Sequence, residues 1–505
     1  MAQIRVTDLT FAYESSADNV LENVSFHIDT DWKLGLIGRN GKGKTTLLQL
    51  FIGKYPYQGS ITGSTRFDYF PYTVSDPGKT AAELSEEWKP QVKSWQVLAQ
   101  LSQIGMDPEC LYRPFSSLSH GERTRIMLAV LFSADNEFLL IDEPTNHLDT
   151  QARGIVKEYL ASKKGFILVS HDRDLLDAVA DHVLVLNRST VEVQAGNFSS
   201  WRTNRERQDA FAVSENEKHK KEIGKLKAAA DRNSRWAAKS ESTKIGFDPV
   251  KDHDRNISTR AYIGAKTKKL NARVSAYEKR IRREIEEKEG LLQDLEKTVD
   301  LKIRPLSHHK EILVNASDLS LRYASADHAL FEGLCFQIRQ GDRLFFSGRN
   351  GSGKSSVIRA VLARAGFEQT PGLIISGTLE TASGLVISYV SQDTSFLRGS
   401  VKAFCRQRFL DESLFLAILR QLDLGRGQFD KNMEDYSEGQ KKKVLIAASL
   451  LTPAHLYIWD EPLNYIDVFS REQIEKLILQ YRPTMLLVEH DVRFLENTAT
   501  GTVFL

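Results

Sequence analysis

The chain has 505 residues, a hydrophobic content of 41% and a charged content of 27%, which are ordinary values for a soluble globular protein of two or three domains. No run of about 18 apolar residues occurs, so the sequence predicts no membrane span. The start, MAQIRVTDLTF, lacks the basic and apolar regions of a signal peptide. The three cysteines, Cys110, Cys335 and Cys405, have no CxxC or CxxH spacing, which argues against a disulfide framework or a zinc site. These features predict a cytoplasmic protein.

The net charge of +2 hides an uneven distribution. Residues 218–283 carry 20 Lys and Arg against 7 Asp and Glu, a local balance of +13. Of the 68 basic and 66 acidic residues in the chain, 48 basic and 59 acidic residues then lie elsewhere, a balance of −11. The middle of the chain is therefore where a polyanion would bind.

An internal repeat divides the chain. Five segments recur in the same order: VTDLTFAY as ASDLSLRY, GLIGRNGKGKTTLL as FFSGRNGSGKSSVI, SLSHGERTRIMLA as DYSEGQKKKVLIA, FLLIDEPTNHLD as LYIWDEPLNYID, and FILVSHDRDLL as MLLVEHDVRFL. Order and spacing hold over about 180 residues in each half. We predict two copies of one domain, 1–200 (the first half) and 306–505 (the second half), joined by a linker, 201–305.

Each half contains a GxxxxGK[ST] segment after a strand-like apolar run and before an amphipathic helix. Such a P-loop turns backbone N–H groups around phosphate oxygens at a helix N-terminus. Its lysine reaches the β- and γ-phosphates, and its Thr or Ser hydroxyl binds Mg²⁺. The predicted phosphate-binding residues are Gly38, Asn40, Gly41, Gly43, Lys44, Thr45 and Thr46 in the first half and Gly348, Asn350, Gly351, Gly353, Lys354, Ser355 and Ser356 in the second.

Two further strand ends carry chemistry in each half. An apolar run ends in Asp-Glu, where the Asp suits a Mg²⁺-bound water and the Glu can orient or deprotonate an attacking water. Another apolar run ends in a histidine; a lone histidine there is usually structural, but its recurrence favours a γ-phosphate contact. The predicted catalytic residues are Glu143, Glu461, His171 and His490.

The P-loop, LSHGE/YSEGQ, Asp-Glu-Pro, NHLD/NYID and strand–His segments together resemble the ATP-binding cassette (ABC) family. The resemblance implies an α/β fold in which two cassettes face head to tail, with each ATP between the P-loop of one half and the signature serine of the other. Site one would combine Lys44, Thr45, Asp142, Glu143 and His171 with Ser437, Gly439 and Gln440; site two would combine Lys354, Ser355, Gln392, Asp460, Glu461 and His490 with Ser119, Gly121 and Glu122. Tyr13 and Tyr323 would stack on adenine, and Mg²⁺ would be bound through Thr45, Asp142, Ser355, Gln392 and Asp460.

One departure from the ABC pattern separates the two sites. The metal-sensing glutamine of the family is present as Gln392 in YVSQD, whereas the first half reads YFPYT and has Tyr72 in its place. A tyrosine hydroxyl can accept a hydrogen bond but is a poor substitute for an amide beside Mg²⁺. Site one is therefore expected to hydrolyse ATP differently from site two.

The two signatures also depart from the pattern. His120 and Glu438 replace the first glycine of each signature, and Glu122 replaces the glutamine of the first. Since Ser119 and Gly121 remain, we still expect ATP to bridge the halves.

The linker favours two helices. From Trp201 to about Glu241 the sequence is rich in Lys, Glu and Ala, which predicts a helix about 60 Å long. From about Lys268 to Asp300, apolar residues keep the steps expected for one seam of an antiparallel helical hairpin. A solvated coiled-coil spacer is the alternative, but a spacer needs neither the +13 charge nor a Gly/Pro loop.

A loop near 242–264 would form the tip of this hairpin, because glycine and proline interrupt the helical pattern there. Basic side chains along the linker suit RNA phosphates, and aromatic ones at the tip suit stacking on bases or a small ligand site. The tip candidates are Lys244, Ile245, Phe247, His253, Arg255, Arg260 and Tyr262.

Two cassettes fused through a long basic linker resemble the ABC-F branch, whose members bind ribosomes. The segments WAAKSESTKIG, AYIGAKTKKL, YSEGQKKK and IWDEPLNYID are similar to those of antibiotic-resistance ABC-F proteins of the Lsa and Vga kind. Many housekeeping factors of the branch carry an insertion in the first cassette. None is present here, since Tyr72 to Ser119 is 47 residues and Gln392 to Ser437 is 45.

The resemblance implies an ATPase that enters the tRNA exit site with both ATPs bound and protects the ribosome from drugs of the peptidyl-transferase centre, of the lincosamide, streptogramin A and pleuromutilin type. The linker would press on P-site tRNA, and the tip would approach the drug site in the large-subunit rRNA. Hydrolysis would reopen the cassettes and release the protein, which is expected to be a monomer.

Three alternatives stay open at this point. One is an ABC-F translation factor that relieves stalling without a drug. Another is the ATPase subunit of a transporter with separate membrane subunits. The third is a DNA-associated ABC-F protein, although such proteins usually carry a basic C-terminal coiled coil and only 15 residues follow His490 here.

Overall fold

The computed structural model of the chain describes residues 3–13, 19–134, 137–146, 148–186, 190–242, 279–280, 283, 302–326, 328–367, 369–370 and 372–505. Its contacts define two compact units, Met1–Trp201 together with Val299–Leu505, and Arg202–Thr298. Among the described helices, none combines the length and apolar character that a bilayer span needs. The domain boundaries at 200/201 and 305/306 stay a prediction.

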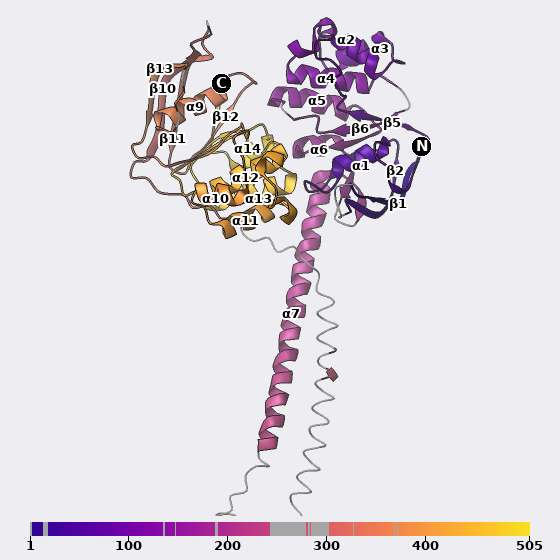
Figure 1. The fold of residues 1–505 in the computed structure, drawn as a ribbon, viewed down its shortest axis with the longest axis vertical. Coiled ribbons are helices and arrows are strands. Elements are labelled where there is room, and N and C mark those ends of the chain that lie inside the picture. Colours follow the sequence, from indigo (N-terminus) through magenta and orange to yellow (C-terminus); the bar gives the residue numbers. More distant parts are fainter. Residues whose placement is uncertain are drawn as a thin grey trace, which may run out of the picture. The chain divides into compact units, whose positions relative to one another are not determined.

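The first half alternates strands and helices (Figure 1). In chain order its elements are β1 (Gln3–Phe11), β2 (Leu21–Asp29), β3 (Lys33–Ile37), α1 (Lys44–Phe51), β4 (Gln58–Thr62), β5 (Arg66–Phe70), α2 (Ala81–Trp88), α3 (Ser94–Gln103), the 3-10 turns η1 (Pro108–Tyr112) and η2 (Phe115–Ser117), α4 (His120–Leu131), β6 (Glu137–Asp142), α5 (Thr150–Ala161), β7 (Phe166–Val169), α6 (Arg173–Val179), β8 (His182–Leu186) and β9 (Val191–Ala195).

The second half repeats this order. Its elements are β10 (Ile312–Tyr323), β11 (Phe331–Arg339), β12 (Arg343–Ser347), α9 (Lys354–Arg364), β13 (Leu373–Thr381), β14 (Ile387–Val390), α10 (Val401–Gln407), α11 (Glu412–Gln421), η3 (Arg426–Gln428), η4 (Met433–Asp435), α12 (Glu438–Leu451), β15 (Leu456–Asp460), α13 (Val468–Tyr481), β16 (Met485–Val488), α14 (Val492–Thr498) and β17 (Gly501–Phe504).

Each half contains two sheets of matching topology. An antiparallel sheet has the order β2-β1-β4 in the first half and β11-β10-β13 in the second. The core sheet has the order β5-β6-β7-β3-β8-β9 in the first half and β14-β15-β16-β12-β17 in the second. Its strands are parallel except for β9, which pairs antiparallel with β8. The predicted α/β class and the duplicated domain are confirmed.

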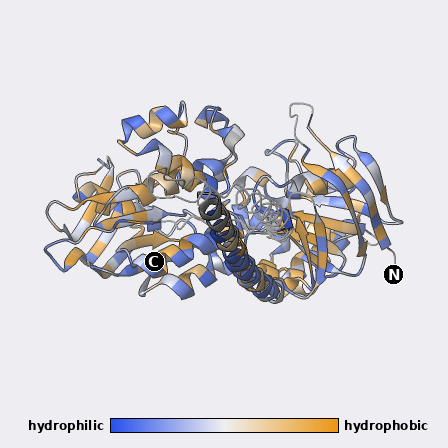
Figure 2. Ribbon diagram, turned by 90° about the horizontal axis from the view of Figure 1, so that it is seen from below, coloured by the Kyte–Doolittle hydropathy of each residue, from blue (hydrophilic) through white to orange (hydrophobic). Residues whose placement is uncertain are grey.

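The core strands are buried because helices such as α4 and α12 pack on one face of each sheet, and α1 or α9 together with the antiparallel sheet packs on the other. Every residue of FILV in β7 and of MLLV in β16 is buried, and such continuous apolar runs are typical of parallel strands. Figure 2 shows hydrophobic residues concentrated in the two halves, whereas the long helix α7 is mainly hydrophilic. The sheets therefore form rigid supports from which the loops at their edges project.

Helix α7 (Phe198–Ser242) has 45 residues, which corresponds to about 68 Å. It confirms the first predicted linker helix. Ala212, Asn216 and Ile223 are buried along it, and their spacing of four and seven residues places them on one face.

The rest of the linker lies mostly outside the described residues. Lys279, Arg280 and Arg283 are helical, but the antiparallel hairpin stays a prediction. The tip candidates Lys244, Ile245, Phe247, His253, Arg255, Arg260 and Tyr262 also lie outside the described residues.

Candidate functional site: two P-loop sites

The predicted site residues lie on loops at one edge of each core sheet. In the first half, β3 leads into the P-loop, β6 ends at the Asp-Glu pair, β7 precedes His171 and β5 precedes Tyr72. In the second half, β12, β15, β16 and β14 lead in the same way to the P-loop, the Asp-Glu pair, His490 and Gln392. Because the strands are parallel, their carboxyl ends meet at one edge, where open α/β sheets bind their ligands.

The P-loops depend on glycine at the start of the following helix. Gly43 and Gly353 cap α1 and α9 with φ of 88° and 100°, a left-handed conformation that favours glycine. A Cβ on Gly43 would also lie 2.6 Å from a methyl group of Val20. Both helices therefore point their N-terminal N–H groups and positive dipole end at the loop.

The P-loop lysines are held by backbone carbonyls. Lys44 Nζ donates to Gly38 O at 2.7 Å, and Lys354 Nζ donates to Gly348 O at 2.8 Å. Burial lowers the pKa of both ammonium groups, and nearby carboxylates oppose this shift. Both side chains are buried, so each loop holds a cation suited to an anionic ligand.

The two predicted adenine-stacking tyrosines lie beside the P-loop helices. Tyr13 Oη lies 2.8 Å from Thr46 Oγ1, and Tyr323 Oη lies 3.0 Å from Ser356 Oγ. These hydrogen bonds tie each ring to the first turn of α1 or α9.

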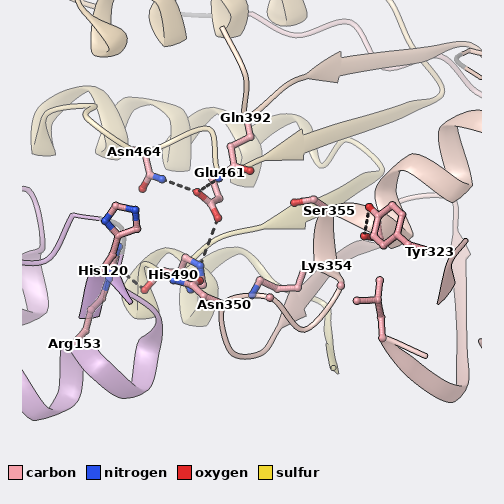
Figure 3. Close-up of a pocket in the computed structure, with 14 residues that line it drawn as sticks. His120, Arg153, Tyr323, Asn350, Lys354, Ser355, Gln392, Glu461, Asn464 and His490 are labelled. Carbon is pink, nitrogen blue, oxygen red and sulfur yellow. Dashed lines mark hydrogen bonds and ion pairs between the residues drawn. The ribbon is translucent and has the colours of Figure 1, made fainter. Parts of the chain in front are cut away.

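A cavity of about 470 Å³ lies at site two (Figure 3). Its lining comes from both halves of the chain. The second half contributes Tyr323, Leu330, Asn350, Gly351, Gly353, Lys354, Ser355, Ser356, Gln392, Glu461, Asn464 and His490, and the first half contributes His120 and Arg153. His120 is one of the signature departures, and it faces the same cavity as the P-loop lysine.

Glu461 is held by polar groups on three loops. Its Oε2 accepts hydrogen bonds from Gln392 Nε2 at 2.9 Å and Asn464 Nδ2 at 2.8 Å, and its Oε1 lies 3.7 Å from His490 Nε2. Burial would raise the pKa of Glu461, but His490 together with the charges of Lys442 and Lys354 outweighs burial and holds this pKa below its usual value. Glu461 has φ of 48°, a strained conformation that is common at functional sites.

Glu143 has the same backbone conformation, with φ of 51°, but different neighbours. Its Oε2 accepts a hydrogen bond from the His171 N–H at 3.2 Å, and its Oε1 lies 3.3 Å from His171 Nε2. Burial and the nearby charge of Asp142 raise the pKa of Glu143 to about 8. Burial also lowers the pKa of His171 well below its usual value, so this imidazole is neutral.

Tyr72 does not replace the glutamine contact in site one. Its hydroxyl donates to Asp68 Oδ2, and its ring stacks on Trp88 with centroids 5.0 Å apart. Asp68 in turn lies 2.8 Å from Nζ of the buried Lys89. The side chain at the glutamine position is therefore engaged away from Glu143.

The residues at both sites fit Mg²⁺, which is usually held by one or two carboxylate or hydroxyl oxygens together with substrate phosphates. Ser355 Oγ lies 3.3 Å from Asp460 Oδ1 at site two. At site one, Asp142 interacts with Thr45 and accepts a hydrogen bond from Tyr69 Oη at 3.0 Å. Among the described residues, no group of three or more His, Cys, Asp or Glu could hold a metal ion without such help.

The signature serines begin helices. Ser119 caps α4 and Ser437 caps α12, each in a capping box with the residue three positions on. Ser119 N donates to Glu122 Oε2 at 2.8 Å, and Ser437 N donates to Gln440 Oε1 at 3.0 Å. Ser119 and Ser437, which are predicted to contact ATP, are therefore each hydrogen-bonded to the first turn of their own helix.

The P-loop of each half contacts the other half. Asn40 Nδ2 donates to Tyr465 O at 2.8 Å, and the Asn350 N–H lies 3.4 Å from Asp149 Oδ2. Tyr465 and Asp149 belong to the NYID and NHLD segments. The two halves thus meet around their P-loops and the loops after their Asp-Glu pairs.

Three residues at these sites were missed by sequence reasoning. Asn464 contacts Glu461, Tyr69 contacts Asp142, and the guanidinium of Arg153 donates to the backbone of the strand–His loop in the other half at 3.2 Å. The repeat holds a signal for two of them, since Asn146 and Arg471 occupy the equivalent places.

The two P-loops and the acidic strand ends beside them define a tandem P-loop ATPase. A model of the ABC transporter family matches residues 21–146 and 331–464, just over half of the chain. The chain therefore belongs to the ABC transporter family, with one ATP-binding domain in each half, and the predicted tandem fold is confirmed.

Similar proteins cover nearly the whole chain. Ribosome protection protein VmlR of Bacillus subtilis is 27% identical over 98% of this chain and 86% of its own length. ATP-binding protein Uup of Caulobacter vibrioides is 25% identical over 97% of this chain and 75% of its own length. The similarity to VmlR confirms the predicted resemblance to ABC-F proteins of the ribosome-protection type.

A solved structure supports the fold alone. The crystal structure of archaeal ribosome recycling factor aABCE1 with the ribosomal stalk protein aP1 gives a TM-score of 0.60 at 19% identity, covering 98% of this chain and 87% of that chain.

Proposed function

We propose that this protein is an ATP-hydrolysing ABC-F protein that binds the ribosome at the tRNA exit site and protects it from antibiotics of the peptidyl-transferase centre. The observation that carries the proposal is the joining of two ATPase domains through the basic segment that contains α7. The full-length similarity to a ribosome protection protein supports it. Lincosamides, streptogramin A compounds and pleuromutilins are the drug classes we expect.

ATP would bind between the halves at two composite sites. The lysine and backbone N–H groups of each P-loop would hold the phosphates, with Tyr13 and Tyr323 beside adenine. The signature helix of the opposite half would close each site with its N-terminus. The cavity at site two already has a lining from both halves.

Mg²⁺ would be held through Thr45 and Asp142 at site one and through Ser355, Gln392 and Asp460 at site two. When bound, it would neutralise phosphate charge. Glu461 would orient and deprotonate the attacking water, because its carboxylate is ionised and fixed by two amide groups. His490 would contact the γ-phosphate.

ATP would act through linkage. If only the closed arrangement of the two halves fits the exit site, ATP favours ribosome binding to the extent that it favours closure. The linker, proposed as residues 201–305, would then lie along rRNA and P-site tRNA. Its tip, Lys244 to Tyr262, would reach toward the drug site, and hydrolysis would release the protein.

The test is ribosome co-sedimentation of the double variant Glu143→Gln, Glu461→Gln. Loss of the general base slows hydrolysis by roughly 100- to 10,000-fold and leaves nucleotide binding intact. The variant should therefore sediment with ribosomes in ATP and not in ADP. Lys44→Ala with Lys354→Ala is the matched control, since it removes phosphate binding. A double Gln variant that sediments no better than this control would rule out ATP-gated ribosome binding.

A further inference from the structure

Two pairs of equivalent positions differ in charge between the two halves. The repeat places Thr124 opposite Lys442 and Ser170 opposite Glu489. Lys442 and Glu489 are 3% and 4% exposed. The second half therefore has two buried charged groups where the first has two hydroxyl groups. A buried charge is costly unless it is paired and hydrogen-bonded, so these two side chains need polar partners.

Lys442 connects the ends of two core strands. Lys442 lies on α12, and its Nζ donates to Ser391 O at 2.9 Å and to Asp460 O at 3.3 Å. Ser391 immediately precedes Gln392, and Asp460 immediately precedes Glu461. One ammonium group therefore fixes the backbone next to the two residues whose side chains meet at 2.9 Å in site two.

Glu489 holds the loop that follows β15 and carries Glu461. Its Oε1 accepts a hydrogen bond from the Leu463 N–H at 2.7 Å, and its Oε2 accepts one from the His490 N–H at 3.0 Å. Leu463 follows Glu461 by two residues. The carboxylate therefore ties the loop that carries Glu461 to the residue that faces it.

Burial lowers the pKa of Lys442 and raises the pKa of Glu489, and nearby charges oppose both shifts. Asp460, Glu461 and Glu489 favour the charged form of Lys442, and Arg471 favours the charged form of Glu489. In the first half the equivalent serine makes a local bond instead, from the Asp172 N–H to Ser170 Oγ at 3.1 Å.

We propose that Lys442 and Glu489 are positioning residues of site two, which hold Gln392, Glu461 and His490 in the arrangement that hydrolyses ATP. The proposal rests on the ATPase function proposed above and adds to it a pair with no charged counterpart in the first half. Neither side chain itself lines the cavity, and both act through backbone groups beside it, including the His490 N–H, so the pair should affect turnover and not ATP binding.

The experiment compares Lys442→Thr, Glu489→Ser and the double variant, which carries the residues of the first half at both positions. Each single variant removes one of two buried charges that attract each other and leaves the other less compensated, so it should lower Tm. The double variant should regain most of that Tm, yet its kcat should stay at least tenfold below wild type, with KM for ATP within about twofold. Lys402→Thr, on the exposed face of α10, is the control and should leave kcat and Tm unchanged.

A double variant with wild-type Tm and wild-type kcat would overturn the proposal, because the pair would then serve folding only. A rise in KM equal to the fall in kcat/KM would also overturn it. Lys442→Arg provides a second test that does not depend on the double variant folding: it keeps the cation and donors, so kcat should stay within about threefold of wild type, and a tenfold loss would contradict the proposal. If wild type itself hydrolyses no ATP, the proposed function fails instead.

Discussion

Glu143 and Glu461 occupy equivalent places, yet their carboxylates have different surroundings. Glu461 accepts hydrogen bonds from two side-chain amides, whereas burial raises the pKa of Glu143 to about 8. A carboxyl group that is protonated near neutral pH cannot accept a proton from water. The two sites thus differ in the surroundings of this glutamate, in addition to the difference between Tyr72 and Gln392 that the sequence shows.

This difference predicts unequal effects of the two single glutamine substitutions. Glu461→Gln should lower kcat by roughly 100-fold or more, the usual size of general-base loss, whereas Glu143→Gln should lower it less than tenfold. Steady-state ATPase assays at pH 7 measure both. Equal losses would show that the two sites contribute alike.

Lys443 and Asp467 form a buried ion pair in the second half. Their side chains lie 3.2 Å apart, and Asp467 also accepts a hydrogen bond from the Ser470 N–H at 3.0 Å. Burial would raise the pKa of Asp467, but Lys443 and this bond outweigh burial and lower it to about 2. Its unfolded pKa is about 3.9, so its ionisation stabilises the fold above pH 4 and is lost as pH falls toward 2.

Asp467→Asn should therefore destabilise the protein by about 2 kcal/mol near pH 7, and by clearly less near pH 3. Urea unfolding of both proteins at the two pH values measures the difference. Asp435→Asn, at an exposed position of the same half, is the control. A difference that is equal at both pH values would mean that the charge of Asp467 does not stabilise the fold.

Among the elements, α7 carries a group of exposed basic side chains. Lys220, Lys221 and Lys225 are exposed on it, and the segment around them holds the excess positive charge of the chain. Lysines that neutralise phosphates release counterions, so their contribution to RNA affinity falls as salt rises.

Changing these three lysines to Glu should weaken ribosome binding at least tenfold at low salt and flatten its salt dependence, while ATP hydrolysis without ribosomes stays near wild type. Binding of the variant across a salt series measures both effects. Lys310, Lys402 and Lys431, which are exposed on the second half, form a control set when changed to Glu together. An equal loss from both sets would mean that net charge, and not α7, determines binding.

At the scale of the whole molecule, ion pairs connect the two halves. Arg173 of α6 lies 2.9 Å from Glu475 of α13, and the two side chains are only 7% and 12% exposed. Reversing one partner of so buried a pair places two like charges together with little solvent, which is strongly unfavourable.

Arg173→Glu should therefore oppose closure of the halves and reduce ATP turnover at least fivefold. Adding Glu475→Arg should restore part of the loss, because the pair is re-formed in the opposite sense. The residual defect comes from Asp491, which lies 3.7 Å from Arg173. ATPase assays of the two single variants and the double variant form a double-mutant cycle, and additive losses would show that the pair does not couple the halves.

The fold and the P-loops could be predicted from sequence because the repeat places each motif at the end of an apolar strand. The rest depends on contacts between residues far apart in the chain. The sequence shows only that Tyr72 stands where the family has a glutamine. Its hydrogen bond to Asp68 and its stacking on Trp88 are seen only in the structure. In the sequence Lys442 is one of three consecutive lysines, and only the structure shows that it is buried and bonded to two strand ends.

The function we propose for this protein is protection of ribosomes from drugs of the peptidyl-transferase centre. The most direct measurement is cell-free translation inhibited by lincomycin, with the purified protein and ATP added over a range of concentrations. We expect wild type to restore translation, and we expect no restoration by the variant with Lys44→Ala and Lys354→Ala. Translation that stays inhibited at every concentration, with ribosome binding intact, would rule out protection and favour a translation factor that acts without a drug.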